Sequence, residues 1–180
     1  LPLHDARNKR MLMPNLAGGR TEFTYRRGAI GIPETNGPSL RARSWTMRAY
    51  VDVPERGCRG VLASMGGSNG GWAAYVNEDG HAELVYRAFE VGTVHLRAGE
   101  PLAAGSRVVE VHLDYDGGGF GMGATITMSV DGVEVDSGRT ERTPRGFFSI
   151  DETFDVGETT GSPVGNYPHV FPFDGGLDRV

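Results

Sequence analysis

Residues 111–164 read VHLDYDGGGFGMGATITMSVDGVEVDSGRTERTPRGFFSIDETFDVGETTGSPV. The stretch begins in an alternating apolar and polar segment, continues through a loop with five glycines, and then alternates again up to Asp131-Gly132. An Asp-Gly pair between two alternating runs is a strong signal for a β-hairpin. A third alternating run and an acid-rich loop follow, so this stretch predicts half of an antiparallel β-sandwich.

Other parts of the chain show the same period of two residues. One apolar row comprises Trp45, Met47, Ala49, Val51 and Val53. The turn predicted at 77–80 ends in Gly80, where a glycine accepts a positive φ. We expect about ten to twelve strands, including 21–26, 44–53, 60–64, 71–76, 81–89, 91–97, 107–116, 147–154 and 171–177. The predicted fold class is all-β, an antiparallel β-sandwich of the jelly-roll or concanavalin A-like kind.

The chain has 180 residues, which fits one domain. We expect residues 1–20 to be a lead-in segment and residues 21–180 to form a single sandwich. Within the lead-in, 6–13 has the composition of one or two helical turns, which Pro14 would end. The 28 glycines are more than helices tolerate and favour many turns between short strands.

The net charge of −5, with no basic run longer than two residues, predicts that nucleic acid is not a partner. No apolar stretch reaches the roughly 20 residues that a membrane-spanning helix needs, so we expect no membrane partner. Cys58 is the only cysteine, which excludes an internal disulfide. Together with the lack of a visible signal peptide, this favours a cytoplasmic location, although a chain beginning at Leu1 does not locate its parent protein.

The one cluster of acidic residues comprises Asp151, Glu152, Asp155 and Glu158. If 147–154 is a strand that continues to Asp155, alternation places Asp151 and Asp155 on one face. Glucanases of this fold class use two glutamates at alternating positions with an Asp between them, and that pattern is missing here. We therefore expect solvated or hydrogen-bonding roles, while Ca²⁺ binding and an interdomain contact remain open alternatives.

Two aromatic residues are candidates for exposure, namely Trp72 after two glycines and Phe120 in the glycine-rich loop. Either could stack on a sugar or pack against a neighbouring domain. The glycine-rich loop itself lacks the Lys and the following helix of a phosphate loop, so we interpret it as a hairpin loop. The five histidines show no metal-ligand spacing, and we interpret Cys58 as a free thiol.

Several longer pieces occur together in one order: LPLHDAR (1–7), FTYRRGAIGIPE (23–34), GVLASMGGSNGGWAAYV (60–76), LDYDGGGFGMGATITMSVDGVEV (113–135) and DETFDVGETTGSPV (151–164). With these pieces the chain resembles the C-terminal domain of large bacterial arylsulfatases over residues 1–180. The resemblance implies a parent enzyme that hydrolyses sulfate esters. Such an enzyme uses a formylglycine made from the Cys of a C-x-[P/S/A]-x-R motif and a divalent cation, Ca²⁺ or Mg²⁺.

That motif is absent here, because Cys58 is followed by Arg59, Gly60, Val61 and Leu62. No catalytic, cofactor-binding or metal-binding residue of the family carries over to this chain. The resemblance therefore implies a non-catalytic C-terminal domain that packs on the catalytic domain of the same chain. We expect the contact with that domain, or with the mouth of the substrate site, to involve Trp72, Phe120, Asp151, Asp155 and Glu158.

Three other functions stay open at this point. The first is a free-standing, lectin-like carbohydrate-binding module, whose ligand would be a glycan, including a sulfated one. The second is a glycosidase, against which the missing glutamate pair argues. The third is an interaction domain without a small ligand. Fold alone does not separate these functions, because sandwiches host many of them.

Overall fold

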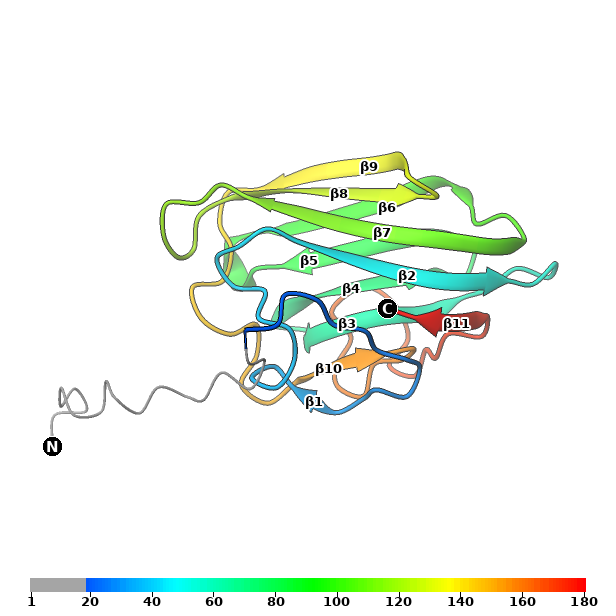
Figure 1. Cartoon of the computed structure of the whole chain (residues 1–180), viewed down its shortest axis with the longest axis horizontal. Helices are drawn as coiled ribbons and strands as arrows, with labels where there is room; N and C mark the ends of the chain where they lie inside the picture. The colour runs from blue at the N-terminus through cyan, green and yellow to red at the C-terminus, as the bar shows by residue number, and fades with distance from the viewer. Residues whose placement is uncertain (1–18) are drawn as a thin grey trace, which may run out of the picture.

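A computed structural model describes residues 19–180 and shows two antiparallel sheets packed face to face (Figure 1). The six-stranded sheet has the order β1 (Ile32–Pro33), β10 (Thr153–Val156), β3 (Gly60–Gly67), β4 (Gly70–Val76), β5 (His81–Arg87) and β6 (Thr93–Pro101). The five-stranded sheet has the order β11 (Gly176–Arg179), β2 (Trp45–Val53), β7 (Gly105–Tyr115), β8 (Ala124–Val130) and β9 (Val133–Thr140). A short 3-10 helix, η2 (Phe89–Val91), joins β5 to β6. The predicted all-β sandwich is confirmed.

The core between the sheets follows from the alternation seen in the sequence. Along β2 the buried side chains are Met47, Ala49, Val51 and Val53, as predicted. Buried rows from the other strands meet them, including Val109, Val111, Leu113, Ile126 and Met128 from the five-stranded sheet and Trp72, Leu84, Tyr86 and Leu96 from the six-stranded sheet. This burial of apolar surface is the main contribution to the stability of the fold.

Trp72 belongs to this core, which corrects the expectation that it is exposed. Its side chain is 1% exposed, and its ring centroid lies 5.4 Å from that of Trp45 across the sandwich. Trp72 lies in β4, within the strand predicted at 71–76, and its side chain faces the core between the two sheets. Its indole N–H has no hydrogen-bond acceptor among the described residues.

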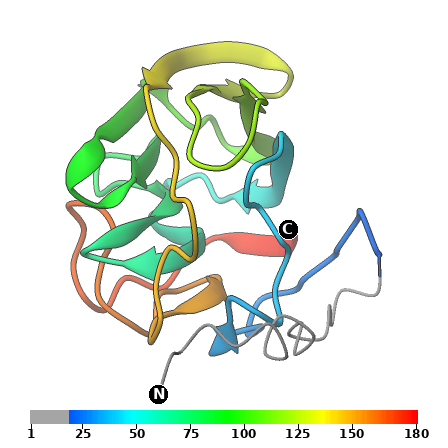
Figure 2. The same ribbon diagram turned by 90° about the vertical axis from the view of Figure 1, so that its left-hand side faces the viewer.

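The outer face of the six-stranded sheet is buried over β3, β4 and most of β5, whereas Thr93, His95 and Arg97 of β6 are exposed. The segment 157–175, between β10 and β11, crosses this face and places Val164, Tyr167 and Phe171 against Val61, Ala73, Tyr75 and Val85. Figure 2 shows the orange-red segment on the outer side of the teal and green strands. We call 157–175 the cover segment. It explains why β3 and β4 are buried along their whole length.

The predicted turns are largely confirmed. Asp131 and Gly132 have φ values of 51° and 81° and form the two-residue turn between β8 and β9. Gly80, with a φ of 86°, closes the turn between β4 and β5. The glycine-rich segment 116–123 joins β7 directly to β8, which confirms the hairpin loop.

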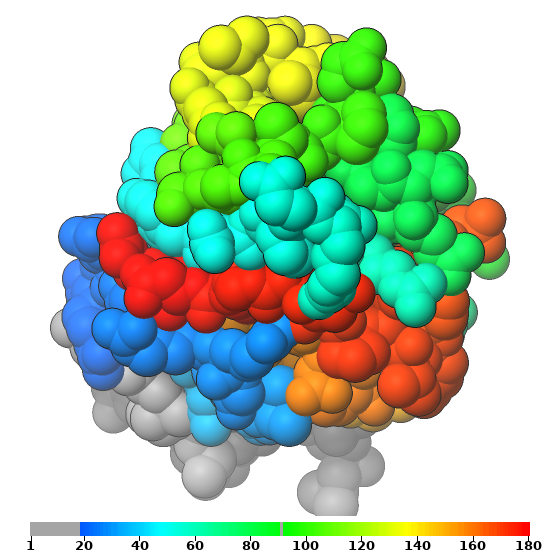
Figure 3. Space-filling model, turned by 90° about the vertical axis from the view of Figure 1, so that its right-hand side faces the viewer, coloured from blue at the N-terminus to red at the C-terminus, as the bar shows by residue number. Residues whose placement is uncertain are grey.

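Three predicted strands differ from the structure. Residues 21–26 form no regular strand, although Tyr25 exchanges two backbone hydrogen bonds with Val180, and Figure 3 shows the red C-terminal strand beside this blue segment. The strand predicted over 147–154 is confined to β10, because the amides of Phe148 and Ser149 donate to the Glu34 carboxylate instead of to a strand. The strand predicted over 171–177 begins only at Gly176. The helical turns predicted at 6–13 lie outside the described residues.

No helix in residues 19–180 is both long enough and apolar enough to cross a membrane.

Candidate functional site

An open groove lies at one end of the sandwich, where four segments meet. They are the β3–β4 turn, η2, the glycine-rich loop 116–123 and the segment 141–152. The groove has a volume of about 850 Å³ and is lined by Asn69, Ala88, Phe89, Gly121 and residues 142–151. We call it the end groove. Its volume falls in the range of about 300–1,000 Å³ that is usual for ligand sites.

Exposed apolar side chains gather at this end. Phe89 is 43% exposed and Ile150 is 99% exposed, and both line the end groove. Phe120, at 66%, and Met122 are exposed in the adjacent glycine-rich loop, so the predicted exposure of Phe120 is confirmed. Phe89 has a φ of 51°, a left-handed backbone conformation that a bulky residue rarely adopts. Strained residues of this kind cluster at functional sites.

Arg142 and Arg145 are exposed along the same groove, and neither guanidinium has a hydrogen bond or ion pair within residues 19–180. By contrast, the guanidinium group of Arg139 has hydrogen-bond partners. It donates to both Asp116 oxygens, at 3.1 and 2.7 Å, and to Glu141 at 3.2 Å. Its hydrogen bonds hold the pKa of Asp116 below its ordinary value. The two groove arginines therefore keep their donors available.

Glu34 anchors the part of the groove lining that contains Phe148 and Ser149. Its Oε2 accepts hydrogen bonds from the amides of Phe148, at 2.8 Å, and Ser149, at 3.3 Å. Burial raises the pKa of Glu34, although the two amides and Arg41 oppose the rise. The Phe148 ring is buried edge-on against Tyr86, with 5.7 Å between the ring centroids. The segment that carries the groove residues is thus tied to the sandwich.

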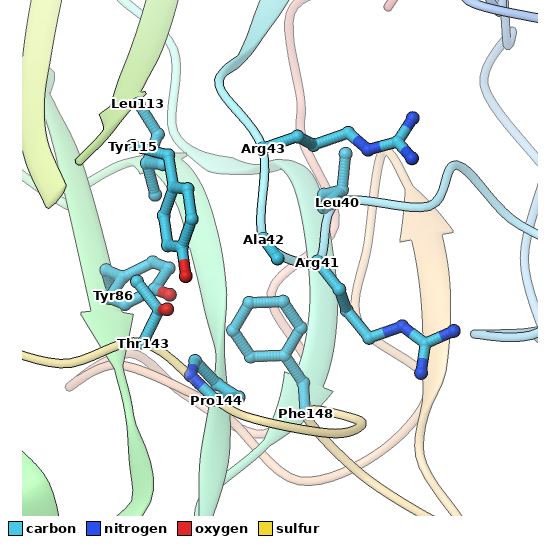
Figure 4. A pocket seen from close by; sticks show the side chains of 10 residues that line it. All are labelled: Leu40, Arg41, Ala42, Arg43, Tyr86, Leu113, Tyr115, Thr143, Pro144 and Phe148. Carbon is cyan, nitrogen blue, oxygen red and sulfur yellow. The ribbon is translucent and has the colours of Figure 1, made fainter. Parts of the chain in front are cut away.

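A much smaller cavity adjoins the groove behind Pro144 and Phe148 (Figure 4). Tyr86, Tyr115 and Thr143 converge there, whereas the guanidinium ends of Arg41 and Arg43 point away. Its volume of about 10 Å³ leaves room for no more than about one water molecule. It is not a candidate site for an organic ligand.

The predicted acidic cluster does not converge. Asp151 is exposed in the end groove and accepts a hydrogen bond of 2.9 Å from the Ser149 hydroxyl. Glu152 accepts from the Ser162 hydroxyl at 2.7 Å, and Glu158 is half-buried. The prediction that Asp151 shares a strand face with Asp155 is wrong, because β10 begins only at Thr153. Within the described part of the chain, no three His, Cys, Asp or Glu residues are placed to hold a metal ion.

Asp155 is 1% exposed, so it cannot reach a partner domain or a substrate as we expected. Its Oδ1 accepts from the Gly31 amide at 2.6 Å and from the Thr153 hydroxyl at 3.1 Å. Its Oδ2 accepts from the Thr160 amide at 2.8 Å and the Thr160 hydroxyl at 2.9 Å. Asp155 therefore joins the start of the cover segment to the loop before β1, which fits the predicted hydrogen-bonding role.

A second polar cluster, which the sequence analysis missed, surrounds Glu83 on the outer face of the six-stranded sheet. The Glu83 side chain is 8% exposed and accepts from the Tyr75 hydroxyl, from Asn77 Nδ2 at 2.7 Å and from His95 Nε2 at 2.8 Å. Burial raises the pKa of Glu83, but these hydrogen bonds outweigh burial and hold it below its ordinary value. The pairing of Tyr75 with Glu83 and of Glu83 with Arg97 across β4, β5 and β6 builds the cluster. A lone Glu in an apolar strand is the signal that could have revealed it.

Cys58 is free and buried beside the start of β3. Burial and the nearby Asp174 raise the pKa of its thiol to about 11, with Arg56 acting in the opposite direction. A thiol of this kind is a poor nucleophile at neutral pH.

No protein-family model and no curated protein matches the sequence. Solved structures do match the fold. The CBM40 domain of the Ruminococcus gnavus IT-sialidase bound to α2,3-sialyllactose aligns with a TM-score of 0.55 and 14% identity, over 77% of this chain and 74% of that one. The same domain bound to α2,6-sialyllactose gives a TM-score of 0.54. Domains LG4-5 of the mouse laminin α1 chain align with a TM-score of 0.52 and 15% identity, over 86% of this chain and 38% of that one.

At these identities the similarity establishes the fold alone. The chain has a jelly-roll sandwich fold, as the CBM40 and laminin LG domains do. The resemblance to arylsulfatase C-terminal domains stays a prediction.

Proposed function

We propose that this domain is a lectin-like carbohydrate-binding module that holds a glycan in the end groove. The observation that carries the proposal is the composition of that groove. It combines the exposed ring of Phe89 with the side-chain donors of Arg142, Arg145 and Asn69, which have no hydrogen-bond partner within residues 19–180. Sugars offer apolar C–H faces that pack on aromatic rings and hydroxyls that need directed polar partners, and mostly apolar sites with a few placed polar groups suit such ligands.

The structural neighbours support this proposal over a catalytic one. The Ruminococcus gnavus CBM40 domain, which has the same sandwich architecture, is known in complex with sialyllactose. A glycosidase would need two carboxyl groups facing each other across the scissile bond. In the described chain, Asp151 is exposed in the groove, whereas Asp155 is buried and fully hydrogen-bonded. Binding without hydrolysis is therefore the function that the groove fits best.

A glycan array followed by calorimetry on any bound glycan tests the proposal. We expect Phe89→Ala to weaken binding about tenfold, because the ring provides the stacking surface. Val133→Ala is the matched control, since Val133 is also exposed but lies at the start of β9, outside the end groove. An array with no bound glycan, or equal weakening by both variants, would refute the proposal.

A second candidate is an accessory domain of an arylsulfatase, packed on the catalytic domain of the same chain. The exposed side chains of Phe120, Met122 and Ile150 favour it, because large apolar side chains gathered at one end of a domain often mark a protein contact. Phe120, Asp151 and Glu158 remain predicted contact residues. The burial of Trp72 and Asp155 removes those two from the expected contact.

Hydrogen exchange tests this second candidate. The reading frame that encodes Leu1 is first searched for a C-x-[P/S/A]-x-R motif. If the motif is present, amides in 116–123 and 147–151 should exchange more slowly in the full gene product than in the isolated domain. Equal exchange in both proteins, or a reading frame without the motif, would exclude the accessory role.

A further inference from the structure

We propose that the glycan bound in the end groove carries a negatively charged substituent, a carboxylate or a sulfate ester, and that Arg142 and Arg145 bind this group. The inference rests on the proposed function and specifies the class of sugar.

Most arginines in the described chain have a defined partner. Arg26, Arg48, Arg59, Arg97, Arg107, Arg139 and Arg179 pair with carboxylates. Arg56 and Arg87 donate to carbonyl oxygens, and Arg20, Arg27 and Arg41 lie over aromatic rings. Within residues 19–180, the arginines with none of these contacts are Arg43, Arg142 and Arg145. Two of these three line the end groove.

The backbone that carries Arg142 and Arg145 is held in place. Between them, the Thr143 amide and hydroxyl both donate to the Met122 carbonyl, each at 2.9 Å. Pro144, which follows, is buried and restricts its own φ. The two arginines thus flank an anchored dipeptide, and only their side chains need to be ordered on binding. Such preorganisation lowers the entropic cost of binding.

Guanidinium groups are suited to planar or tetrahedral oxyanions. Each has five N–H donors in a fixed arrangement and matches a carboxylate or a sulfate with two parallel hydrogen bonds. A neutral sugar needs acceptors as well as donors, whereas an arginine has no acceptor. Two free arginines in a groove are therefore better matched to an anion than to hydroxyl groups alone.

Acidic groups lie near the groove, but none forms an ion pair with Arg142 or Arg145 within residues 19–180. Asp151 lies in the groove, where Ser149 donates to it. Glu141 is paired with Arg139, and Glu90 is exposed beside Phe89. The protein as a whole has a net charge of −5, so unspecific attraction of anions is disfavoured. Binding of an anionic sugar then has to come from the local pair of arginines.

The test compares matched ligands: lactose, 3′-sialyllactose and lactose 3′-sulfate, together with an array of neutral glycans and their sialylated, uronate-containing and sulfated counterparts. We expect the charged member of a pair to bind at least about tenfold more tightly than its neutral counterpart, as charge-assisted hydrogen bonds imply. The Arg142→Gln/Arg145→Gln variant should lose this difference. Arg26→Gln is the control, because Arg26 is also exposed but lies outside the end groove and pairs with Asp178.

Each outcome has a distinct meaning. Preference for the sialylated or uronate ligand identifies a carboxylate, and preference for the sulfated ligand identifies a sulfate ester. If neutral glycans bind as tightly as charged ones and depend on Phe89 but not on the two arginines, this inference fails while the proposed function stands. If no glycan binds, both fail.

Discussion

The outer face of the six-stranded sheet and the end groove use similar residue types in opposite ways. On the sheet face, Tyr75 packs at a tilt against Tyr167 of the cover segment, both rings are buried, and the Glu83 carboxylate has several donors around it. In the end groove, Phe89 is exposed and the guanidinium groups of Arg142 and Arg145 have no partner within residues 19–180. Aromatic and charged residues alone therefore do not mark a site. What distinguishes the two regions is whether the protein itself already satisfies these groups.

Substitutions in the two regions should therefore change different properties, stability in one and binding in the other. Substitutions on the covered face should lower the free energy of unfolding, because they remove buried packing and hydrogen bonds. Substitutions in the end groove should leave stability nearly unchanged, because exposed side chains contribute little to it. Glycan binding should be weakened by substitutions in the end groove and remain nearly unchanged after substitutions on the covered face.

The largest expected effect is that of Tyr167→Ala. Tyr167 packs on Tyr75 and Phe171, and its hydroxyl contacts Thr159 Oγ1 at 3.1 Å. Removing the ring leaves a cavity under the cover segment and should lower the free energy of unfolding by about 3 kcal/mol. Phe89→Ala is the matched aromatic control and should lower it by less than about 1 kcal/mol. Urea denaturation measures both, and similar losses would mean that the two regions do not differ.

A smaller loss is expected for Asp155→Asn. Each carboxylate oxygen of Asp155 accepts two hydrogen bonds, so a side-chain amide nitrogen at either position would face two donors. At least one backbone donor then faces an amide nitrogen instead of an acceptor at this buried side chain, which should cost about 2 kcal/mol. Asp151→Asn, at an exposed carboxylate, should have almost no effect. A stable Asp155→Asn protein would show that the cover segment does not depend on this anchor.

The smallest effect is a pH dependence centred on Glu83. Its pKa in the folded protein lies below the ordinary value of 4.5, because its hydrogen-bond donors outweigh burial. The ionised form therefore stabilises the fold above that ordinary value, and this contribution is lost as the pH falls through the lowered pKa. Wild-type protein should lose more stability than Glu83→Gln as the pH falls below about 4.5. Parallel urea midpoints for the two proteins across that range would contradict the role assigned to Glu83.

Local patterns predicted much of the sandwich, because strand alternation and Asp-Gly turns are short-range signals. The buried row from Met47 to Val53 and the turn at Asp131-Gly132 are examples. The burial of Trp72 was not predicted, since the strand at 71–76 does not reveal that this side chain faces Trp45 of the other sheet. The strand predicted at 147–154 failed because Glu34, more than a hundred residues away, binds the amides of Phe148 and Ser149.

The candidate site was less predictable than the fold. Phe120 and Asp151 were recognised and lie at or beside the end groove. Phe89, Arg142 and Arg145 were not singled out, because nothing local distinguishes an arginine that lacks a partner from one that has one. Arg139 has a partner because the fold brings Asp116, 23 residues earlier, beside it, and no local pattern predicts that proximity.

The position of the cover segment in the chain has a consequence for biosynthesis. Residues 157–175 are translated after every strand of the six-stranded sheet, including β10. Until they emerge from the ribosome, the outer face of that sheet exposes Val61, Ala73, Tyr75 and Val85 to the solvent. Such transiently uncovered apolar surface makes a nascent chain prone to aggregation and gives chaperones a surface to bind. Ribosome-bound chains stopped before residue 157 should therefore carry a hydrophobic face that the finished domain conceals.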